Sequence, residues 1–446
     1  MERDLDFSDD SSYKNPNDTS LGDINHNGKI EPIKVEVTTG EGFEPIGRGN
    51  EYDNSTQITY SRYFYGTFEG NNKTINNLYI QKTDMNLERA AYIGLFGNIT
   101  YGTVVKNLTV TGNIDIKVTN KMYSVYIGSI AGYIQGSGKI EGCNNYVNIK
   151  ASMNVSTYTG GIIGNNGYSG TVNSCNNYGN IEVNYGEYLD EGQYINDIYT
   201  GGIVGNNSGL ITTCNNYNDI KISSTENANA SRPYVGGICG YNSKTIEKCS
   251  NIGNITNTGI GVYIYVAGIS GMNYAADSIN QCFNTGTILN EGDIISSSGS
   301  CQAAGIVASN SGSNTVGSIV ENCYNVGTII NNAKNRRYIG GVVSYNSAKS
   351  KVVNSYNIGN YSNKEELEHL GAIVANPVGK TIQNCYYLQG VYTQGTDTGE
   401  IGTTSKTDTE MKTQEFITLL QGNETETIWK IDSKINNGYP IFVWQQ

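Results

Sequence analysis

The side chains best suited to metal binding, cross-linking or nucleophilic chemistry are nine cysteines. The chain has only two histidines, His26 and His369. Thiolates could bind a metal ion, form disulfides or act as nucleophiles. The sequence contains no Cys-x-x-Cys pair and offers few further ligands, so we predict no metal site at the cysteines. Seven of them recur at one position of a repeat: Cys143, Cys175, Cys214, Cys249, Cys282, Cys323 and Cys385.

Cysteines at one repeat position would stack with parallel side chains about 4.8 Å apart, which is wider than the ~3.8 Å between the Cβ atoms of a disulfide. An odd number of cysteines also argues against complete pairing. We predict a buried column of reduced thiols that pack as small hydrophobic groups. A hydroxyl in this column would lack an assured partner, so Cys214→Ser is expected to cost about 1–3 kcal/mol.

An asparagine follows two residues after most of these cysteines. Side-chain amides in register can hydrogen-bond from coil to coil, and asparagine tolerates the left-handed backbone of a corner. We therefore predict a structural amide ladder rather than a ligand site. Its members are Asn145, Asn177, Asn216, Asn251, Asn284, Asn325 and Asn357.

Tyrosines form a third column, six residues before the last small residue of each repeat phrase. Stacked tyrosines could present a strip that binds a glycan or a protein, or the rings could simply shelter one another. We predict that any binding site uses this column or the long insertions 182–198 and 221–233. The column comprises Tyr126, Tyr158, Tyr199, Tyr234, Tyr265 and Tyr338.

Catalytic motifs are missing from the sequence. It contains no His-Glu-x-x-His, Gly-x-Ser-x-Gly, Walker or dinucleotide-binding pattern. A polysaccharide hydrolase or lyase would need carboxylates clustered on one face, alone or with Lys or Arg. The densest acidic group, Glu182, Glu187, Asp190 and Glu191, lies in one insertion and is typical of a solvated loop. We predict that the protein is not an enzyme.

One segment partly resembles a calcium-binding loop. Residues 23–30 begin like a calcium-binding loop, with oxygen ligands at positions 1, 3 and 5 and a glycine at position 6. Lys34 stands at the twelfth position, where a bidentate acid belongs. We predict no bound metal and no cofactor.

The elements that must position these columns are short β-strands in a repeated phrase. Each copy has a small-residue turn, a β-branched strand and the Cys-x-Asn segment. The last small residue of each phrase falls at Gly97, Gly132, Gly164, Gly205, Gly240, Gly271, Ala308, Ser344 and Ala375, with spacings of 35, 32, 41, 35, 31, 37, 36 and 31 residues. A fixed motif with a varying period indicates a solenoid whose insertions form loops on one face.

Helical periodicity is missing from the repeats, and hairpin signals for a β-propeller, the weaker alternative, are lacking. We therefore predict an all-β protein, a right-handed parallel β-helix (β-solenoid) of about nine or more coils with a small α/β C-terminal cap. At ~4.8 Å per coil, it would form a rod roughly 50–70 Å long.

The chain divides into four predicted segments: a disordered acidic leader over 1–20, an N-terminal cap with the first coils over 21–90, the repeat solenoid over 91–395 and a C-terminal capping segment over 396–446. In the last segment, Thr407-Asp408-Thr409-Glu410 is a capping box and Gly422 a stop signal. They predict one helix over 407–421, which closes the solenoid end together with a terminal strand over 439–444.

Composition limits the partners. The net charge of −12 and the absence of a basic run make nucleic acid and anionic lipid poor partners. No stretch of 18 apolar residues occurs, so we predict no membrane insertion. Residues 1–6 lack the features of a signal peptide, which fits either a trimmed extracellular chain or a cytoplasmic protein.

The repeats resemble a known family. Residues 92–97, Tyr-Ile-Gly-Leu-Phe-Gly, followed by 105–110, are similar to the Gly-Leu-x-Gly (GLUG) repeat, and the stretches 43–78 and 429–444 resemble the segments that flank such arrays. The resemblance implies a secreted or surface protein of a bacterium. Some relatives carry the array beside the metalloprotease region of an immunoglobulin A protease, but the required His-Glu-x-x-His is not found here.

These observations favour a non-catalytic extracellular or cell-surface β-solenoid whose signal peptide has been removed. It would serve as a stalk or adhesin that binds a host protein or a glycan, as a monomer or as part of a larger surface protein. The alternatives are a β-helix polysaccharide lyase or hydrolase, and a subunit of an extracellular fibre, against which the distinct C-terminal cap counts.

Overall fold

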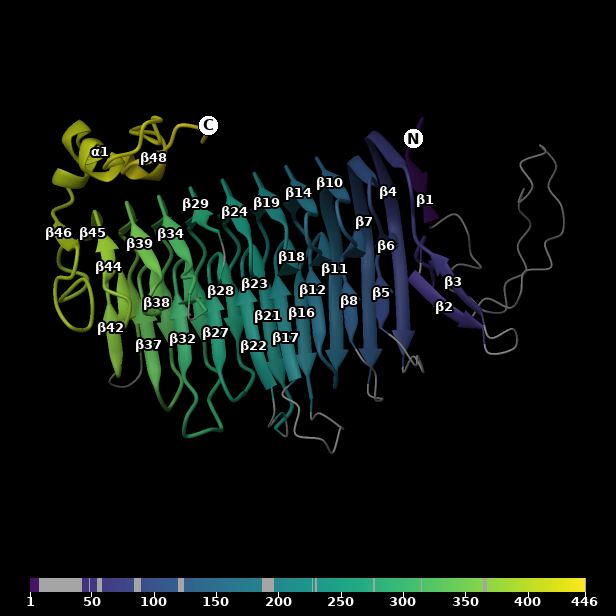
Figure 1. The fold of residues 1–446 in the computed structure, drawn as a ribbon, viewed down its shortest axis with the longest axis horizontal. Coiled ribbons are helices and arrows are strands. Elements are labelled where there is room, and N and C mark those ends of the chain that lie inside the picture. Colours follow the sequence, from purple (N-terminus) through teal and green to yellow (C-terminus); the bar gives the residue numbers. More distant parts are fainter. Residues whose placement is uncertain are drawn as a thin grey trace.

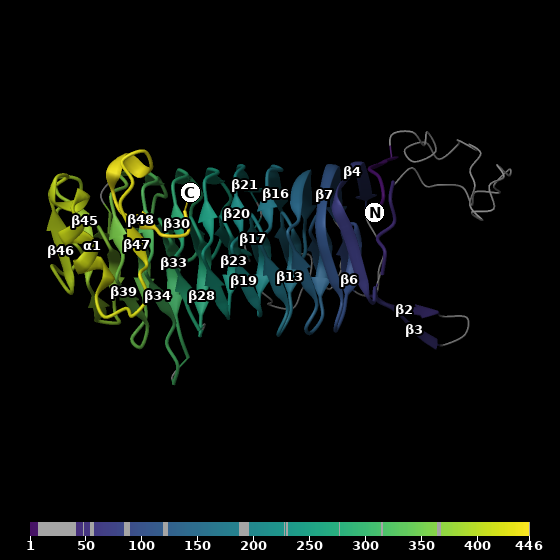
Figure 2. The same cartoon turned by 90° about the horizontal axis from the view of Figure 1, so that it is seen from above.

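The computed structural model describes residues 1–7, 42–47, 49–53, 58–83, 90–118, 124–186, 196–226, 228, 231–275, 277–313, 315–363 and 367–445. These residues form an all-β parallel solenoid, as the sequence predicted, with about eight turns where about nine or more coils were expected. The coils succeed one another along the long axis of an elongated molecule (Figures 1 and 2).

Two of the sheets have nine parallel strands each, one from every repeat phrase. The first, which we call the tyrosine sheet, consists of β5 (Ala91–Ile93), β8 (Val125–Ile127), β12 (Thr157–Gly160), β17 (Asn196–Gly201), β22 (Ser231–Gly236), β27 (Ile264–Ala267), β32 (Cys301–Ala304), β37 (Arg337–Gly340) and β42 (His369–Gly371). The second, the asparagine sheet, consists of β6 (Phe96–Ile99), β9 (Ala131–Ile134), β13 (Ile163–Asn166), β18 (Val204–Asn207), β23 (Cys239–Asn242), β28 (Ser270–Tyr274), β33 (Val307–Ser311), β38 (Val343–Asn346) and β43 (Val374–Pro377).

The third sheet, the long sheet, has 26 strands, and most coils contribute three of them in succession. Its strands are β1 (Leu5–Asp6), β4 (Thr67–Thr83), β7 (Val104–Val118), β10 (Lys139–Glu141), β11 (Asn144–Met153), β14 (Thr171–Asn173), β15 (Asn176–Asn177), β16 (Ile181–Tyr185), β19 (Leu210–Thr212), β20 (Asn215–Asn216), β21 (Ile220–Ser224), β24 (Thr245–Glu247), β25 (Ser250–Asn251), β26 (Ile255–Asn257), β29 (Ile279–Asn280), β30 (Phe283–Asn284), β31 (Ile288–Asn290), β34 (Ile319–Glu321), β35 (Tyr324–Asn325), β36 (Ile329–Asn331), β39 (Lys351–Val353), β40 (Tyr356–Asn357), β41 (Tyr361–Ser362), β44 (Thr381–Gln383), β45 (Cys385–Leu388) and β46 (Thr403–Lys406).

The small residue at the end of each phrase is required by a close approach of two sheets. A Cβ atom on Gly164 would lie 2.6 Å from the backbone nitrogen of Ile127 and 2.8 Å from the carbonyl oxygen of Tyr158. Only glycine, or a small residue with a slight shift, fits where the tyrosine and asparagine sheets come together. The interior beside this bend is filled by isoleucine and valine, such as Ile162 and Ile163, which are fully buried.

The structure places the seven predicted cysteines in one buried column of the long sheet, and all nine cysteines of the chain are buried with free thiols. Each thiol in the column donates to the carbonyl oxygen two residues earlier, as Cys214 Sγ does to Thr212 at 3.2 Å. The backbone N–H of the preceding coil donates to the sulfur, as Cys175 N does to Cys214 Sγ at 3.4 Å. Ser355 occupies the same column and makes both contacts through its hydroxyl, donating to Val353 O at 2.8 Å and accepting from Cys323 N at 3.1 Å. The prediction that a hydroxyl lacks a partner here is therefore wrong.

The seven predicted asparagines form a continuous buried ladder. Each Nδ2 donates to the Oδ1 of the next coil, for example Asn177 to Asn216 at 2.7 Å and Asn216 to Asn251 at 2.8 Å. The remaining links join Asn145 to Asn177, Asn251 to Asn284, Asn284 to Asn325 and Asn325 to Asn357. The left-handed corner lies elsewhere, at the residue before each cysteine, such as Thr213 with φ of 55°.

A second buried amide ladder was not predicted. It runs along the asparagine sheet, where Asn166 donates to Asn207 at 2.8 Å and Asn207 to Asn242 at 2.7 Å. It continues through Asn273, Asn310 and Asn346. Each of these residues stands two positions after the small anchor residue of its phrase, as in Gly-Asn-Asn. The regular spacing in the sequence could therefore have predicted this second ladder.

The N-terminus departs from the predicted leader over 1–20. Leu5 and Asp6 form β1, which pairs in parallel with β4, and Met1 and Phe7 pack against the core. The open backbone edge of β4 and the apolar end of the coil explain why this short segment is ordered. Residues 49–53 and 58–62 form an antiparallel pair, β2 (Gly49–Asp53) and β3 (Ile58–Arg62). The predicted leader over 8–20 and the calcium-like segment 23–30 lie outside the described residues.

The C-terminal segment contains a 3-10 turn, η3 (Glu410–Lys412), followed by α1 (Gln414–Gln421). The predicted capping box forms, because Thr407 N donates to Glu410 Oε2 at 2.8 Å and Glu410 N donates to Thr407 Oγ1 at 3.3 Å. It opens only the 3-10 turn. Thr413 is extended and starts α1 afresh by accepting from Phe416 N at 3.2 Å. The helix ends at Gly422, as predicted.

The helix does not close the end of the axis. From β46, the chain turns back along the side of the solenoid through α1, β47 (Trp429–Lys430), the 3-10 turn η4 (Asn436–Gly438) and β48 (Ile441–Phe442) (Figures 1 and 2). Trp429 and Phe442 cover an outward aromatic column of the long sheet formed by Phe283, Tyr324, Tyr356 and Tyr386. The segment therefore protects an apolar side face.

Candidate functional site

The predicted tyrosine column exists and is longer at its N-terminal end than predicted. Tyr92, Tyr126, Tyr158, Tyr199, Tyr234 and Tyr265 are paired in register on consecutive strands of the tyrosine sheet. Neighbouring rings are stacked with centroids 4.5–5.3 Å apart. Tyr338 belongs to the same register but not to the stack, because Gln302 separates it from Tyr265. Its ring instead meets His369 edge-on.

Exposure divides the column into two parts. Tyr234, Tyr265 and Tyr338 are 5%, 8% and 6% exposed, so a ligand has little access to their rings. Tyr92, Tyr126, Tyr158 and Tyr199 are half-buried and open on one edge. Burial, with a smaller effect of the neighbouring rings, raises the pKa of Tyr92 to about 12 and the pKa of Tyr126 still further. The rings are therefore neutral hydroxyl donors at physiological pH.

A second outward row lies beside the column, on the asparagine sheet. Its residue follows the small anchor residue of each phrase, and the row reads Asn98, Tyr133, Asn165, Asn206, Tyr241, Met272, Ser309, Tyr345 and Asn376. Tyr133 packs edge-to-face with Tyr126 at 5.3 Å and 89°. Tyr241 does the same with Tyr234 at 5.7 Å and 87°. Between these two rings, two successive coils carry asparagine.

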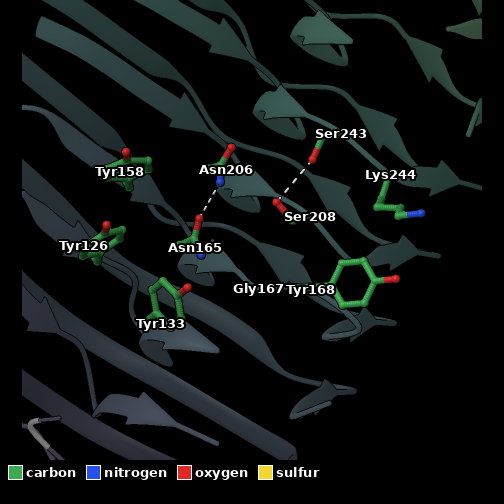
Figure 3. Close-up of a pocket in the computed structure, with 10 residues that line it drawn as sticks. All are labelled: Tyr126, Tyr133, Tyr158, Asn165, Gly167, Tyr168, Asn206, Ser208, Ser243 and Lys244. Carbon is green, nitrogen blue, oxygen red and sulfur yellow. Dashed lines mark hydrogen bonds between the residues drawn. The ribbon is translucent and has the colours of Figure 1, made fainter. Parts of the chain in front are cut away.

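An open hollow of about 620 Å³ lies where the row carries asparagine. Figure 3 shows Tyr126, Tyr133 and Tyr158 on one side of it and Tyr168 and Lys244 on the other. Asn165 and Asn206 lie between them, with the hydroxyls of Ser208 and Ser243 farther along (Figure 3). We call this surface the tyrosine groove. It is lined by aromatic edges, amides and hydroxyls.

Hydrogen bonds fix the polar part of the groove. Asn206 Nδ2 donates to Asn165 Oδ1 at 2.5 Å. Ser243 Oγ lies within donating distance of two acceptors, the carbonyl oxygen of Asn207 at 3.0 Å and Ser208 Oγ at 3.2 Å, which share its single hydrogen. The Lys244 ammonium lies 3.3 Å from Asp277 and 5.8 Å from the centre of the Tyr168 ring. Tyr168 is 72% exposed and presents an open ring to solvent.

Carboxylates are scarce around the groove. Within the part of the chain that the structure describes, none lines the hollow, and along the tyrosine column Asp197 accepts from the Tyr199 hydroxyl at 2.9 Å. Asp197 is also held by Arg232 through two hydrogen bonds of 2.8 and 3.1 Å. Glycoside hydrolysis ordinarily uses two carboxyl groups across the scissile bond. Among the described residues that line the groove, no such pair is present.

Only part of the predicted acidic insertion falls within the described residues. Glu182 is exposed on β16, while Glu187, Asp190 and Glu191 lie outside the described residues. The described ranges hold no group of three or more His, Cys, Asp and Glu side chains that could share a metal ion. Within the same ranges, no helix has both the length and the apolar character needed to cross a bilayer.

Several groove residues were missed in the sequence. Tyr92 was overlooked because it stands five residues before Gly97, while the other column members stand six before their anchor. The residues of the second row directly follow each anchor residue in the sequence. Their change from tyrosine to asparagine in two successive coils is the signal that could have located the groove. Tyr168 and Lys244 lie in the turns after the strands, where the repeat gives no fixed register.

Comparison with known proteins yields one weak structural likeness. No protein-family model matches the chain, and no curated protein matches its sequence. A crystal structure of a Bacteroides ovatus protein, provisionally named an immunoglobulin A1 protease, shares 15% identity with this chain. The match covers 84% of this chain and 77% of that one, with a TM-score of 0.27. A likeness this weak carries no argument about fold or activity.

Proposed function

We propose that this protein is a non-catalytic extracellular β-solenoid of a bacterium, a surface stalk or adhesin that binds a glycan or a host protein through the tyrosine groove. The observation that carries the proposal is the set of half-buried tyrosines Tyr126, Tyr158 and Tyr199 beside a hollow lined by Asn and Ser. Tyrosine provides large amphipathic contacts at low entropic cost, and Ser, Asn and Gly provide adaptable hydrogen bonds.

The repeat resemblance supports the cellular setting. GLUG-like arrays imply a secreted or surface protein, and this chain would act there as a monomer or as part of a larger surface protein. The net charge of −12 disfavours nucleic acid and anionic membranes as partners. The C-terminal end of the long sheet disfavours the fibre alternative, because its last strand, β46, is short and carries the exposed polar residues Thr404 and Ser405.

A matched pair of variants tests the proposal. Tyr126→Ala with Tyr158→Ala removes two stacked rings from the groove. Tyr178→Ala with Tyr217→Ala removes two rings that are stacked almost as closely, 4.7 Å apart against 4.5 Å, directly after two short strands of the long sheet. Binding to glycan arrays and immobilised host matrix proteins should fall at least about tenfold in the groove variant only, since buried aromatic contacts dominate binding energy.

Equal binding by the two variants, once both are shown to be folded, would place the contact elsewhere. The same preparations would be incubated with a panel of polysaccharides. Release of reducing ends or unsaturated sugars by the wild type would replace the proposal with the enzyme alternative.

A further inference from the structure

In the second outward row, two asparagines stand between two tyrosines and leave a space that a ring would otherwise fill. Tyr133 lies edge-to-face against Tyr92 and Tyr126, and Tyr241 lies edge-to-face against Tyr199 and Tyr234. Asn165 and Asn206 hold the two positions between these rings. Among the ring pairs of the described residues, Tyr158 therefore has only its stacking neighbours, Tyr126 and Tyr199. We call the space over Asn165 and Asn206 the tyrosine gap.

We propose that the tyrosine gap binds one sugar ring of an uncharged glycan that crosses the groove. This inference rests on the proposed binding function and names the ligand of that same site. The edge of Tyr158 forms one side of the gap, Tyr133 and Tyr241 bound it along the axis, and the Asn165–Asn206 amide pair forms its floor.

The hydrogen-bonding capacity of the floor favours a polyol. The bond from Asn206 Nδ2 to Asn165 Oδ1 leaves Asn165 Nδ2 as a donor and Asn206 Oδ1 as an acceptor. Neither atom has a further partner in the part of the chain that the structure describes. A sugar hydroxyl can both donate and accept, so neighbouring hydroxyls of one ring satisfy both amide atoms. An aromatic side chain of a protein partner would fill the same space but cover these atoms without bonding them, which is unfavourable.

The electrostatics of the groove favour a neutral ligand. Of the described residues that line the hollow, none is a carboxylate and one, Lys244, is cationic and paired with Asp277 at 3.3 Å. The net charge of −12 repels acidic polysaccharides at long range. The hollow is open rather than enclosed, and its volume of about 620 Å³ is within the range of ligand sites. An open hollow admits an internal unit of a chain as well as its end.

The test fills the gap with the residue that the row uses on either side. Asn165→Tyr and Asn206→Tyr, singly and together, would fill the gap with the same side chain that Tyr133 and Tyr241 provide on either side of it. Asn376→Tyr is the matched control, because Asn376 belongs to the same row next to Tyr345, near its C-terminal end. A second pair, Asn165→Leu with Asn206→Leu, keeps the side-chain size and removes the donor and the acceptor. It carries the test if the filled variants fail to fold.

The probes are an array of uncharged oligosaccharides (glucans, mannans, galactans and N-acetylhexosamine polymers), a parallel array of uronic and sialic acid glycans, and immobilised host matrix proteins. The wild type and Asn376→Tyr should bind uncharged oligosaccharides equally. The filled and leucine variants should lose at least about tenfold in affinity, because the sugar hydroxyls no longer find the amide donor and acceptor in the gap.

Two results would overturn the inference and leave the proposed function standing. The first is binding to acidic glycans or proteins alone that still depends on Tyr126 and Tyr158. The second is binding of neutral glycans that the filled and leucine variants retain. Failure of the wild type to bind any probe would overturn both the inference and the proposed function.

Discussion

Asn206 donates its amide hydrogen to Asn165 over 2.5 Å, in the direction opposite to that of the buried pair beside it, in which Asn166 donates to Asn207. The buried pair belongs to a ladder that uses its amides from coil to coil along the core. The outward pair is isolated between two tyrosines and keeps a donor and an acceptor for solvent or a ligand. One sequence phrase, Gly-Asn-Asn, thus supplies both a structural bond and a candidate binding bond.

The buried amide ladder should be most sensitive in its middle. Asn216→Ala removes the acceptor of Asn177 and the donor to Asn251, and leaves both atoms buried. We expect a loss of about 2–4 kcal/mol in the free energy of unfolding, because each unsatisfied group costs about 1–3 kcal/mol. Urea denaturation measures it. Asn215→Ala, one residue earlier on the half-exposed outer side, is the control and should cost under about 1 kcal/mol. Equal losses would refute the ladder as a stabilising element.

The cysteine column should accept serine better than alanine. Ser355 already makes the two hydrogen bonds that Cys214 makes, so Cys214→Ser should cost less than about 1 kcal/mol. Cys214→Ala leaves the buried N–H of Cys175 without its acceptor and should cost about 1–3 kcal/mol. Thermal or urea unfolding of the two variants decides the order, and a larger loss for serine would contradict it.

Alkaline pH should destabilise the protein. Burial raises the pKa of column thiols such as Cys214 well above the ordinary 9.0 and raises the pKa of Tyr241 from 10.0 to about 12. The unfolded chain loses these protons first, so the stabilisation is complete below pH 9 and decreases as pH rises from 9 towards 12. Each group contributes up to about 1.4 kcal/mol per pH unit in that window. Urea midpoints at pH 7, 9, 10 and 11 should fall steeply above pH 9; a flat profile would contradict the burial of these groups.

The C-terminal segment should detach without unfolding the repeats. Trp429 and Phe442 cover Tyr324 on the side of the long sheet, and coils of a solenoid depend mainly on their neighbours. In Trp429→Ala, hydrogen exchange should rise in 407–445, while the inner strands β18 and β23 keep their protection. Global loss of protection in the repeats would show that the segment is required for the fold.

Much of the scaffold could be predicted from the sequence, because repeat register converts one-dimensional spacing into neighbours along the axis. Cys214, Asn216 and Tyr158 were placed in columns by that logic alone. The C-terminal segment could not be placed this way, since its contacts are non-local. A signal existed in the residue after each cysteine, which changes from Asn215 and Ser250 to Phe283 and Tyr324 where the segment covers the sheet.

The candidate site was predicted less completely than the fold. Spacing identified the tyrosine column but not which rings are accessible, because exposure depends on the neighbouring row. Met272 and the alanines beside Tyr265 bury that end of the column, while Asn165 and Asn206 leave Tyr158 open. Single-residue differences between otherwise equivalent coils therefore decide where a ligand can reach.

The most direct test of the binding groove is protection of an introduced thiol by the ligand, which is possible because the natural cysteines are buried. Because all nine natural thiols are buried, Ser208→Cys places the one accessible thiol in the groove, and Thr285→Cys places one on the exposed long sheet. Labelling rates with a thiol reagent would be measured with and without the best ligand from the binding arrays. The account predicts that the ligand slows labelling at position 208 and leaves position 285 unchanged. Protection at 285, or an unchanged rate at 208 under saturating ligand, would contradict it.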